Sequence, residues 1–354
     1  MNVVFIGCGN ITNSRHIPAV KRVVGEKNLS VGLIAVKTID AEKTSRNFKS
    51  SRIFVGDILE GEIPDWLPQA ELIIIGTPPN THLPLIDRLL EIAPSSKILC
   101  EKPIGVDEDQ INRFRTSPTL KINSNRLFIM HNFQFSQGFV KAKQIIASGK
   151  FGKVLNFHAH QYSSKSRGLP EWYENLPLGL FWDECSHFFY LANAICGEFK
   201  VEHVNASFQS RISTPNQLDI NGRSPNKIPI SFRMNFDAPI SEWGCSIICE
   251  RGVIFVDMFR DFTIAIKSDR EHKTLDVLRS SSSFVFQFIF GFITSGWQYL
   301  IRKKSYGTDQ VIEALVGKNP DNLELIRIEE GLRVIGQMLV VSSFLKTNVR
   351  DNNP

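Results

Sequence analysis

The chain has few cysteines, and their pattern is not typical of a metal site or of a disulfide framework. Its 354 residues include six Cys, which are scattered without a Cys-x-x-Cys pair. One of them, Cys8, lies in a glycine-containing turn where a disulfide would disrupt the backbone. We therefore expect reduced thiols, a cytoplasmic protein and no bound metal. His158 and His160 alternate along a predicted strand and share a face, but the sequence indicates no third ligand.

We expect no signal peptide, because the sequence opens with a predicted strand. The sequence shows no internal repeat and no low-complexity segment. Its most apolar stretch, 284–301, is shorter than the ~20 residues of a spanning helix and is interrupted by Gln and Ser. We favour a buried or subunit-interface segment in a homo-oligomer. The alternative is contact of 284–304, which ends in Arg302-Lys303-Lys304, with a membrane surface or a lipid-linked substrate.

Strong charge of one sign is absent as well. The 41 Lys and Arg exceed the 36 Asp and Glu by five, and the positive residues are not clustered enough to indicate a nucleic-acid partner. A chain of this length is comfortable for two domains, each with its own core. Composition therefore agrees with a soluble enzyme.

The first third of the chain alternates short apolar runs with helical patterns, which predicts a doubly wound parallel sheet. We expect this first domain to span 1–130 and a second domain to span 131–354. The strands expected in the first domain are 3–6, 31–36, 52–55, 72–75, 97–100 and 126–130.

The remainder of the chain shows mainly strand patterns. A helix at 140–148 and a strand at 154–160 open the second domain. Pro215–Asn226 is mostly polar, with two Pro and a Gly, and is predicted to be a loop. A long helix is predicted at about 322–346. The further strands expected are 201–210, 229–236, 243–249, 253–257 and 262–266.

The first functional motif is a Gly-x-Gly turn directly after the first strand. Gly7 allows a tight turn, and Gly9 lets the backbone approach a pyrophosphate at the amino terminus of the following helix. Asn10 and Ile11 open that helix and complete the predicted phosphate site. The third position of the fingerprint is Thr12 rather than Gly or Ala, so the match is incomplete.

A second motif, Gly76-Thr77-Pro78-Pro79-Asn80-Thr81-His82, follows the apolar strand 72–75. Asn80 is expected to cap the next helix. His82 would then lie in the first turn, at the sheet edge where ligands bind. The alternative is an ordinary turn and cap.

The third motif, Glu101-Lys102-Pro103, also follows an apolar strand. Open α/β sheets bind ligands outside the carboxyl ends of their strands. A Lys at this position can hold a substrate oxygen and stabilise the charge that develops on it. Taken alone, the tripeptide could equally be a surface turn.

The fourth motif places Asp183 and His187 four residues apart at the start of an apolar helix, so that they would share one helix face. A carboxylate beside an imidazole fixes its tautomer and supports its protonated form, which suits acid–base catalysis. The alternative is a satisfied core histidine.

Together these motifs resemble the Gfo/Idh/MocA family of oxidoreductases, from residue 1 to about residue 200. The order is Gly7-x-Gly9, the Thr77–His82 motif, Glu101-Lys102-Pro103, a Gly-containing turn at 148–154, and Asp183-x-x-x-His187. The resemblance implies that 1–130 is a dinucleotide-binding Rossmann domain for NAD(P). It implies that 131–354 is an α+β domain with an open, mostly antiparallel sheet, for substrate binding and oligomerisation. The implied substrates are sugars, sugar derivatives or cyclitols. The resemblance also implies that Lys102 and His187 are catalytic and that Asp183 supports the histidine or contacts substrate.

The chain departs from the family pattern at three positions near these motifs. The family often has Gly at Cys185, Asp at Tyr190 and Arg at Gln134. These changes leave Lys102 and His187 in place and leave the substrate open.

The predicted cofactor-binding set combines the residues of these motifs with the end of the second strand. Lys37 and Thr38 stand where NAD enzymes of this fold usually carry an acid, and both suit a 2′-phosphate, so we favour NADP over NAD. Asp40 is the residue that would reverse this choice. The full set is Gly7, Gly9, Asn10, Ile11, Lys37, Thr38, Thr77, Pro78, Asn80, His82, Glu101 and Lys102.

Three functions are compatible with these residues. The favoured one is hydride transfer to or from a secondary alcohol or ketone of a sugar, sugar nucleotide or cyclitol. A regulator of the same fold would be expected to lack the Lys or the His, and both are present here. An NAD-dependent lyase or glycosidase would use the same two residues, so only product analysis separates it from the first.

Overall fold

The computed structural model describes residues 1–169, 171–208, 213–269, 273–301 and 305–351. The chain forms two compact units, Met1–Asn132 with Gly307–Ile335, and Phe133–Tyr306 with Gly336–Pro354. The sequence-based division at residue 130 had assigned everything after it to the second domain. The structure instead returns the segment 307–335 to the first unit.

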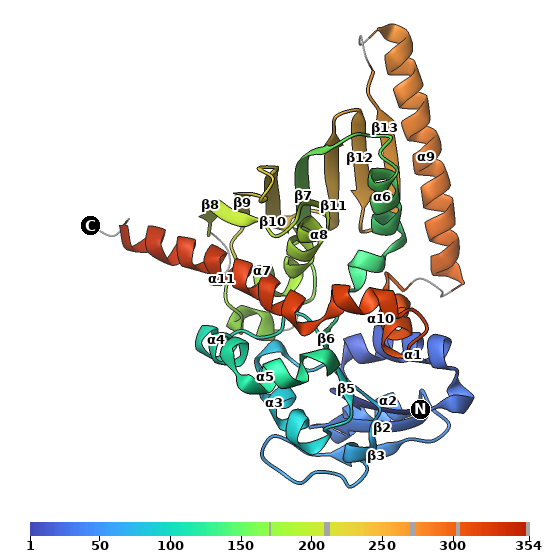
Figure 1. The fold of residues 1–354 in the computed structure, drawn as a ribbon, viewed down its shortest axis with the longest axis vertical. Helices are drawn as coiled ribbons and strands as arrows, with labels where there is room; N and C mark the ends of the chain where they lie inside the picture. Colours follow the sequence, from blue (N-terminus) through green and yellow to red (C-terminus); the bar gives the residue numbers. More distant parts are fainter. Residues whose placement is uncertain (170, 209–212, 270–272, 302–304, 352–354) are drawn as a thin grey trace. The chain divides into compact units, whose positions relative to one another are not determined.

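The first unit is built on a parallel sheet that, among the described residues, has the strand order β3-β2-β1-β4-β5-β6 (Figure 1). This is the Rossmann order, whose reversal point lies between β1 and β4. Every pairing in this sheet is parallel. The strands are β1 Asn2–Ile6, β2 Ser30–Ala35, β3 Arg52–Val55, β4 Leu72–Ile75, β5 Lys97–Cys100 and β6 Leu127–Ile129.

The central strands are buried on both faces because helices cover the sheet on each side. Ile73 and Leu99, for example, are fully buried, as expected for the continuous apolar runs of a parallel sheet. The predicted strands of this unit are confirmed to within one or two residues at their ends. Its helical segments are η1 Thr12–His16, α1 Ile17–Val24, α2 Thr38–Ser45, η4 Pro79–Thr81, α3 His82–Ile92, α4 Glu108–Thr116 and α5 Pro118–Asn123.

The returning segment 307–335 is held by polar contacts to the first unit. It contains α10 Thr308–Leu315, η8 Pro320–Ile326 and the first part of α11 Ile328–Asp351. Asp309 accepts two hydrogen bonds from Arg22 of α1, at 2.7 and 2.8 Å. The long helix predicted at 322–346 is present but begins at Ile328, because Asn319 and Pro320 start a separate 3-10 segment before it.

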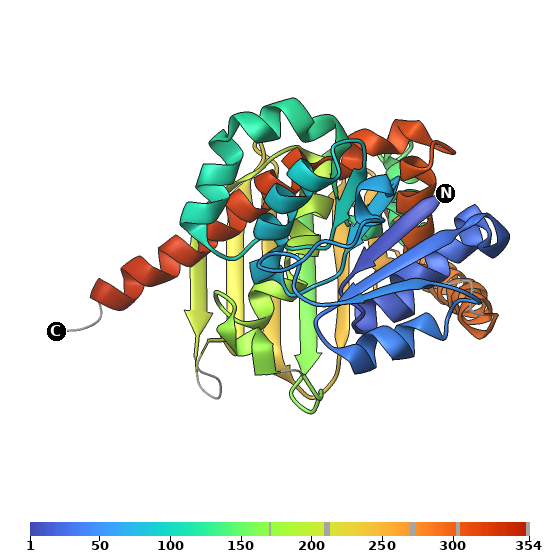
Figure 2. The same cartoon turned by 90° about the horizontal axis from the view of Figure 1, so that it is seen from below.

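The second unit is built on a mixed sheet with the strand order β13-β12-β11-β7-β10-β9-β8 among the described residues (Figure 2). Only β7 and β10 pair in parallel in this sheet, so it is mostly antiparallel, as predicted. Its strands are β7 Val154–Ser164, β8 Lys200–Ser207, β9 Gln217–Arg223, β10 Pro229–Ala238, β11 Glu242–Cys249, β12 Gly252–Asp257 and β13 Phe262–Lys267.

Strand β9 corrects the predicted loop at 215–226. Leu218, Ile220 and Gly222 alternate inward and are buried, whereas the residues between them point outward. The outward residues are polar, which disguised the period of two that marks a half-buried strand. The turn is confined to Ser224–Lys227, where the Lys227 N–H donates to the Ser224 carbonyl at 2.9 Å.

One face of the second sheet is covered by helices and the other is open. In β7, Phe157 and Ala159 are buried on the covered face, whereas His160 and Tyr162 are exposed on the opposite face. Helix α6 Gln137–Ala147 packs on β12 and β13, and α8 Ser186–Cys196 packs on β7.

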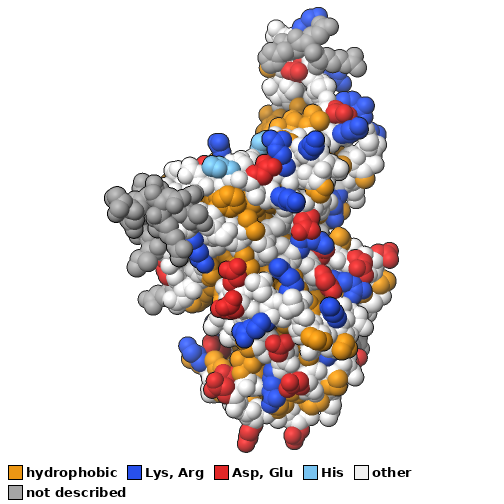
Figure 3. Space-filling model, turned by 60° about the vertical axis from the view of Figure 1, so that its left-hand side comes forward, with side chains coloured by type: hydrophobic (Ala, Val, Ile, Leu, Met, Phe, Trp, Pro, Cys, Tyr) orange, Lys and Arg blue, Asp and Glu red, His pale blue; other side chains and the backbone are white. Residues whose placement is uncertain are grey.

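A long helix, α9 Thr274–Leu300, runs beside the edge strand β13 (Figure 1). Within the described residues it is the one helix whose length and composition suit a membrane span, and 6% of its apolar window is buried. The predicted segment 284–301 is therefore not buried in this chain. Charged side chains gather elsewhere on the surface. On the face shown in Figure 3, basic and acidic side chains are interspersed.

Candidate functional site

The turn after β1 has the geometry of a phosphate-binding loop. Gly7 has φ +90°, and its N–H donates to the Ile34 carbonyl of the neighbouring strand at 2.9 Å. A Cβ at Gly7 would lie 2.7 Å from the Gly76 carbonyl oxygen, which is closer than any side chain tolerates. Only glycine lets the two turns at the reversal point lie this close.

Side chains that the sequence analysis did not select hold this turn in place. The Thr12 hydroxyl donates to the Gly7 carbonyl at 2.6 Å. The Asn13 amide donates to the carbonyls of Cys8 and Gly9 and to the Thr44 hydroxyl of α2, at 2.9 to 3.0 Å. The sequence signal was present, because short polar side chains just inside a helix often bond to the preceding backbone.

A cavity of about 360 Å³ lies beside this turn, within the first unit. Of the predicted cofactor residues, Gly7, Gly9, Thr77 and Pro78 line it, and Asp40 lines it as well. Nothing lies within 4 Å of a Cβ built on Gly9, so the backbone there is open to a ligand. A cradle that a Cβ would fill, at the carboxyl ends of β1 and β4, fits a dinucleotide pyrophosphate.

The other predicted cofactor residues do not line this cavity. Lys37 is the exposed residue before α2, whose first turn carries Thr38 and Asp40. Asn80 lies within η4, so the prediction that it caps α3 is wrong: the residue before α3 is Thr81, which makes no side-chain cap. Two consecutive prolines start a 3-10 turn first and shift the helix start by one residue.

His82 is fully buried and joins two of the strand-end loops. Its Nδ1 lies 2.8 Å from the Pro103 carbonyl oxygen and its Nε2 lies 2.9 Å from the Thr77 carbonyl oxygen. Burial lowers the pKa of His82, so the neutral ring donates to one of these oxygens at a time. His82 therefore positions the loops after β4 and β5.

Glu101 is paired with a histidine that the sequence analysis had not selected. His16 Nε2 lies 2.8 Å from Glu101 Oε1, and both side chains are buried. Burial by itself raises the pKa of Glu101, but the hydrogen bond to His16 and the nearby positive charges, that of Lys102 among them, outweigh it and leave the pKa below its usual value. The second carboxylate oxygen accepts the Lys102 N–H at 3.1 Å. Glu101 thus fixes the backbone that carries Lys102.

Lys102 itself is half-buried at the end of β5, and its peptide bond to Pro103 is cis. Burial, together with the Lys102 charge, lowers the pKa of His131 to about 3. A neutral His131 therefore accompanies the cationic Lys102 in the first unit.

In the second unit, the single helix predicted to carry Asp183 and His187 is two helices. Asp183 belongs to α7 Leu180–Glu184 and His187 to α8, with Cys185 between them. The Phe188 N–H bonds back three residues to the Cys185 carbonyl, at 3.0 Å. Asp183 hydrogen-bonds Tyr173, whose pKa is raised by burial, by the charges of Asp183 and Glu184, and by this bond.

His187 lies half-buried among aromatic side chains. Its Nδ1 lies 2.8 Å from the Tyr190 hydroxyl, which also accepts the Phe133 N–H at 3.3 Å. The rings of Phe133 and Trp243 lie 4.8 and 5.7 Å from the His187 ring. With Nδ1 bonded to Tyr190, Nε2 is the atom suited to exchange a proton with a substrate.

The structure thus places Lys102 in the first unit and Asp183 and His187 in the second. Their joint action at one catalytic centre stays a prediction.

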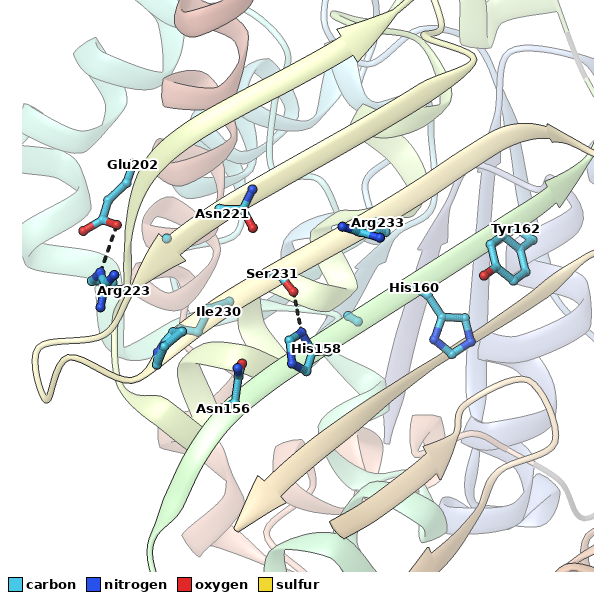
Figure 4. A pocket seen from close by; sticks show the side chains of 13 residues that line it. Asn156, His158, His160, Tyr162, Glu202, Asn221, Arg223, Ile230, Ser231 and Arg233 are labelled. Carbon is cyan, nitrogen blue, oxygen red and sulfur yellow. Dashed lines mark hydrogen bonds and ion pairs between the residues drawn. The ribbon is translucent and has the colours of Figure 1, made fainter. Parts of the chain in front are cut away.

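A second cavity, of about 710 Å³, lies on the open face of the second sheet (Figure 4). The close-up shows His158 bonded to Ser231 at 2.5 Å, with His160 and Tyr162 farther along β7. Burial lowers the pKa of both histidines. Among the described residues, no group of three or more His, Cys, Asp and Glu side chains could hold a metal ion.

Comparison with known proteins matches two family models. Residues 1–117 match "Oxidoreductase family, NAD-binding Rossmann fold", and residues 139–255 match the Gfo/Idh/MocA C-terminal domain. The uncharacterised oxidoreductase YdgJ of Escherichia coli is 24% identical over 160 residues, which are 45% of this chain and 42% of YdgJ. The chain therefore spans less than half the length of this relative.

Two solved structures of dehydrogenases share the fold. Myo-inositol dehydrogenase from Corynebacterium glutamicum has a TM-score of 0.70 at 14% identity, with 98% of this chain and 97% of that chain covered. The WlbA dehydrogenase from Bordetella pertussis, in complex with NADH and UDP-GlcNAcA, has a TM-score of 0.68 at 15% identity, with 98% and 96% covered.

Proposed function

Because this chain belongs to the Gfo/Idh/MocA family of NAD-binding oxidoreductases, we propose that it transfers a hydride to or from a secondary alcohol or ketone of a sugar, sugar nucleotide or cyclitol. The observation that carries the proposal is the open backbone at Gly9 in the cavity beside β1 and β4. The solved relatives named above, a myo-inositol dehydrogenase and a dehydrogenase bound to NADH and UDP-GlcNAcA, support this substrate class.

Two side chains would act on the substrate oxygen, one by stabilising its charge and the other by transferring its proton. A bound nicotinamide would supply the acceptor or donor of the hydride. The Lys102 ammonium would hold the substrate oxygen and stabilise negative charge on it. His187 Nε2 would accept the proton of the alcohol, or return it to the ketone oxygen, while Tyr190 holds Nδ1.

The choice of dinucleotide rests on residues that act in opposite directions. Lys37 and Thr38, at the start of α2, support the preference for NADP that the sequence predicts. Asp40 lines the cavity and would repel a 2′-phosphate. We keep NADP as the proposal. Lys37→Glu should then weaken NADPH more than NADH, and Asp40→Ser should leave NADPH bound. Tighter binding of NADH than NADPH, lost in Asp40→Ser, would reverse the assignment.

A screen for cofactor reduction tests the reaction. Purified protein is mixed with NAD or NADP and a panel of sugars, sugar nucleotides and cyclitols, and the appearance of reduced nicotinamide is recorded, with His187→Ala as the control. Turnover of at least one substrate that His187→Ala lacks supports the proposal. Tight cofactor binding with no turnover across the panel would point to a regulator. Product analysis of any active substrate separates oxidation from elimination.

A further inference from the structure

Helix α9 presents its large apolar side chains outward. Between Phe284 and Ile301 the chain carries no Asp, Glu, Lys or Arg. The side chains of this stretch that are more than half exposed are Val285, Phe286, Ile289, Phe290, Phe292, Ile293, Trp297, Tyr299 and Leu300. A monomeric protein rarely leaves a continuous apolar surface of this extent in water.

The less exposed stripe of α9 is formed mainly by small and polar residues, while the rings of Phe284 and Phe288 at its border contact Phe255 and Phe262 of the sheet. The stripe recurs every three or four positions and consists of Asp276, Ser280, Ser283, Gln287, Gly291, Ser295 and Gln298. The amphipathicity of the helix is therefore the reverse of that of a helix packed on a core, where the apolar stripe faces inward.

Specific contacts hold this polar stripe on β13. The Gln287 amide accepts the Ala265 N–H at 2.9 Å and donates to the Ala265 carbonyl at 3.1 Å, as a neighbouring strand would. Gly291 lets the helix approach closely, since a Cβ there would lie 2.6 Å from Phe262. Ser295 donates to the Arg260 carbonyl. The stripe thus covers the sheet edge and fixes which side of α9 faces outward.

The outward apolar residues extend around about half of the helix circumference, at 3.6 residues per turn. A lipid surface covers an apolar face of this width when the helix lies in its plane, and a second copy of the chain is the competing occupant. Charges flank the apolar stretch: Lys273 and Arg279 precede it, and Arg302-Lys303-Lys304, outside the described residues, follow it in the sequence. An anionic lipid surface complements these cations.

We propose that α9 docks this protein on an anionic membrane surface, with its apolar side in the interfacial layer. The helix lies in the plane of the membrane because its polar stripe is bound along β13 from Gln287 to Ser295, and a spanning helix would have to break these contacts. Trp297 and Tyr299 have the amphipathic rings that favour the headgroup region.

Vesicle co-sedimentation of the full chain tests this docking. The vesicles are phosphatidylcholine alone and phosphatidylcholine with phosphatidylserine. The triple variant Phe286→Ser, Phe290→Ser, Ile293→Ser removes three outward side chains that are 60–72% exposed. Ile122→Ser is the matched control, because Ile122 is 76% exposed on α5 of the first unit. We expect binding to the anionic vesicles that falls at least about 10-fold in the triple variant and is unchanged in the control.

Two further measurements separate membrane docking from misfolding and from self-association. A circular dichroism spectrum and a cooperative unfolding transition that match those of the parent chain show that the triple variant is folded. Brominated lipids should quench part of the tryptophan fluorescence, and Trp297→Phe should abolish that part. Failure of the parent chain to bind anionic vesicles would overturn the proposal, as would binding that the triple variant retains. Sedimentation as a dimer that the triple variant converts to a monomer, without vesicle binding, would assign the surface to a second copy.

Discussion

Two regions place their functional atoms by different means. One is the predicted dinucleotide groove, which is the cavity beside Gly7 and Gly9 in the first unit. The other is the cluster around His187 in the second unit, which contains Tyr190, Phe133 and Trp243. In the groove, backbone atoms do the work: Gly7 closes the turn against Gly76, and Gly9 leaves space for a ligand. In the cluster, side chains do it: Tyr190 bonds His187 Nδ1, and Phe133 and Trp243 pack against the ring. Substitutions that add atoms should therefore disrupt the groove, and substitutions that remove atoms should disrupt the cluster.

Removing the histidine ring should have the largest effect. His187→Ala should lower turnover by about 10²–10⁴-fold, the usual contribution of a positioned general acid or base, while dinucleotide affinity stays at the parent value. Lys102→Ala should lower turnover to a similar extent by losing charge stabilisation at the substrate oxygen. Steady-state kinetics and a binding titration measure both quantities. Near-normal turnover in both variants would remove them from the mechanism.

Adding atoms to the two glycines should separate folding from binding. Gly9→Val fills open space, so it should abolish dinucleotide binding with little change in the free energy of unfolding. Gly7→Ala meets the Gly76 carbonyl at a φ of +90° and should lower the free energy of unfolding by about 1–3 kcal/mol. Denaturant unfolding and cofactor titration of both proteins distinguish the two roles. Unchanged cofactor affinity in a folded Gly9→Val protein would refute the phosphate site.

The first unit should also show an acid sensitivity that comes from His131. Burial holds its pKa at about 3 in the folded state, against about 6.5 when unfolded. Because the unfolded chain binds the extra proton between these values, stability should fall as the pH drops from 6.5 towards 3, by at most about 1.4 kcal/mol per pH unit. His131→Asn should flatten this dependence of the unfolding midpoint on pH. An equally steep profile in the variant would assign it to other groups, of which buried His82 is the first to test.

The smallest effect should come from one oxygen atom in the cluster. Tyr190→Phe keeps the ring but removes the hydroxyl that bonds His187 Nδ1. The loss of one hydrogen bond, worth about 0.5–1.5 kcal/mol, should lower turnover by roughly 2–10-fold. Tyr173→Phe, which removes the partner of Asp183, is the comparison on α7. If Tyr173→Phe costs turnover and Tyr190→Phe does not, the carboxylate rather than the tyrosine supports the catalytic step.

Local pattern determined much of this molecule in advance. The strands of the first unit, the turn at Gly7 and the positions of most strands in the second sheet follow from apolar runs, glycine spacing and strand alternation. These features depend on neighbours along the chain, and the sequence therefore determined them. The prediction failed where local patterns compete, as at Asn80, where two prolines begin a 3-10 turn before the helix.

Tertiary structure decided the features that depend on residues far apart in the sequence. His16 bonds Glu101, which is 85 positions away in the sequence, and Arg22 bonds Asp309, which is 287 positions away. Neither pair therefore has a local sequence pattern that would predict it. The polar residues of β9 gave its sequence the pattern of a loop, because the residues that bury its other side lie elsewhere in the chain. For α9, composition determined only that the helix is apolar. The bonds of Gln287 to β13 decided which side faces outward, because the backbone N–H and C=O groups of an edge strand need hydrogen-bond partners.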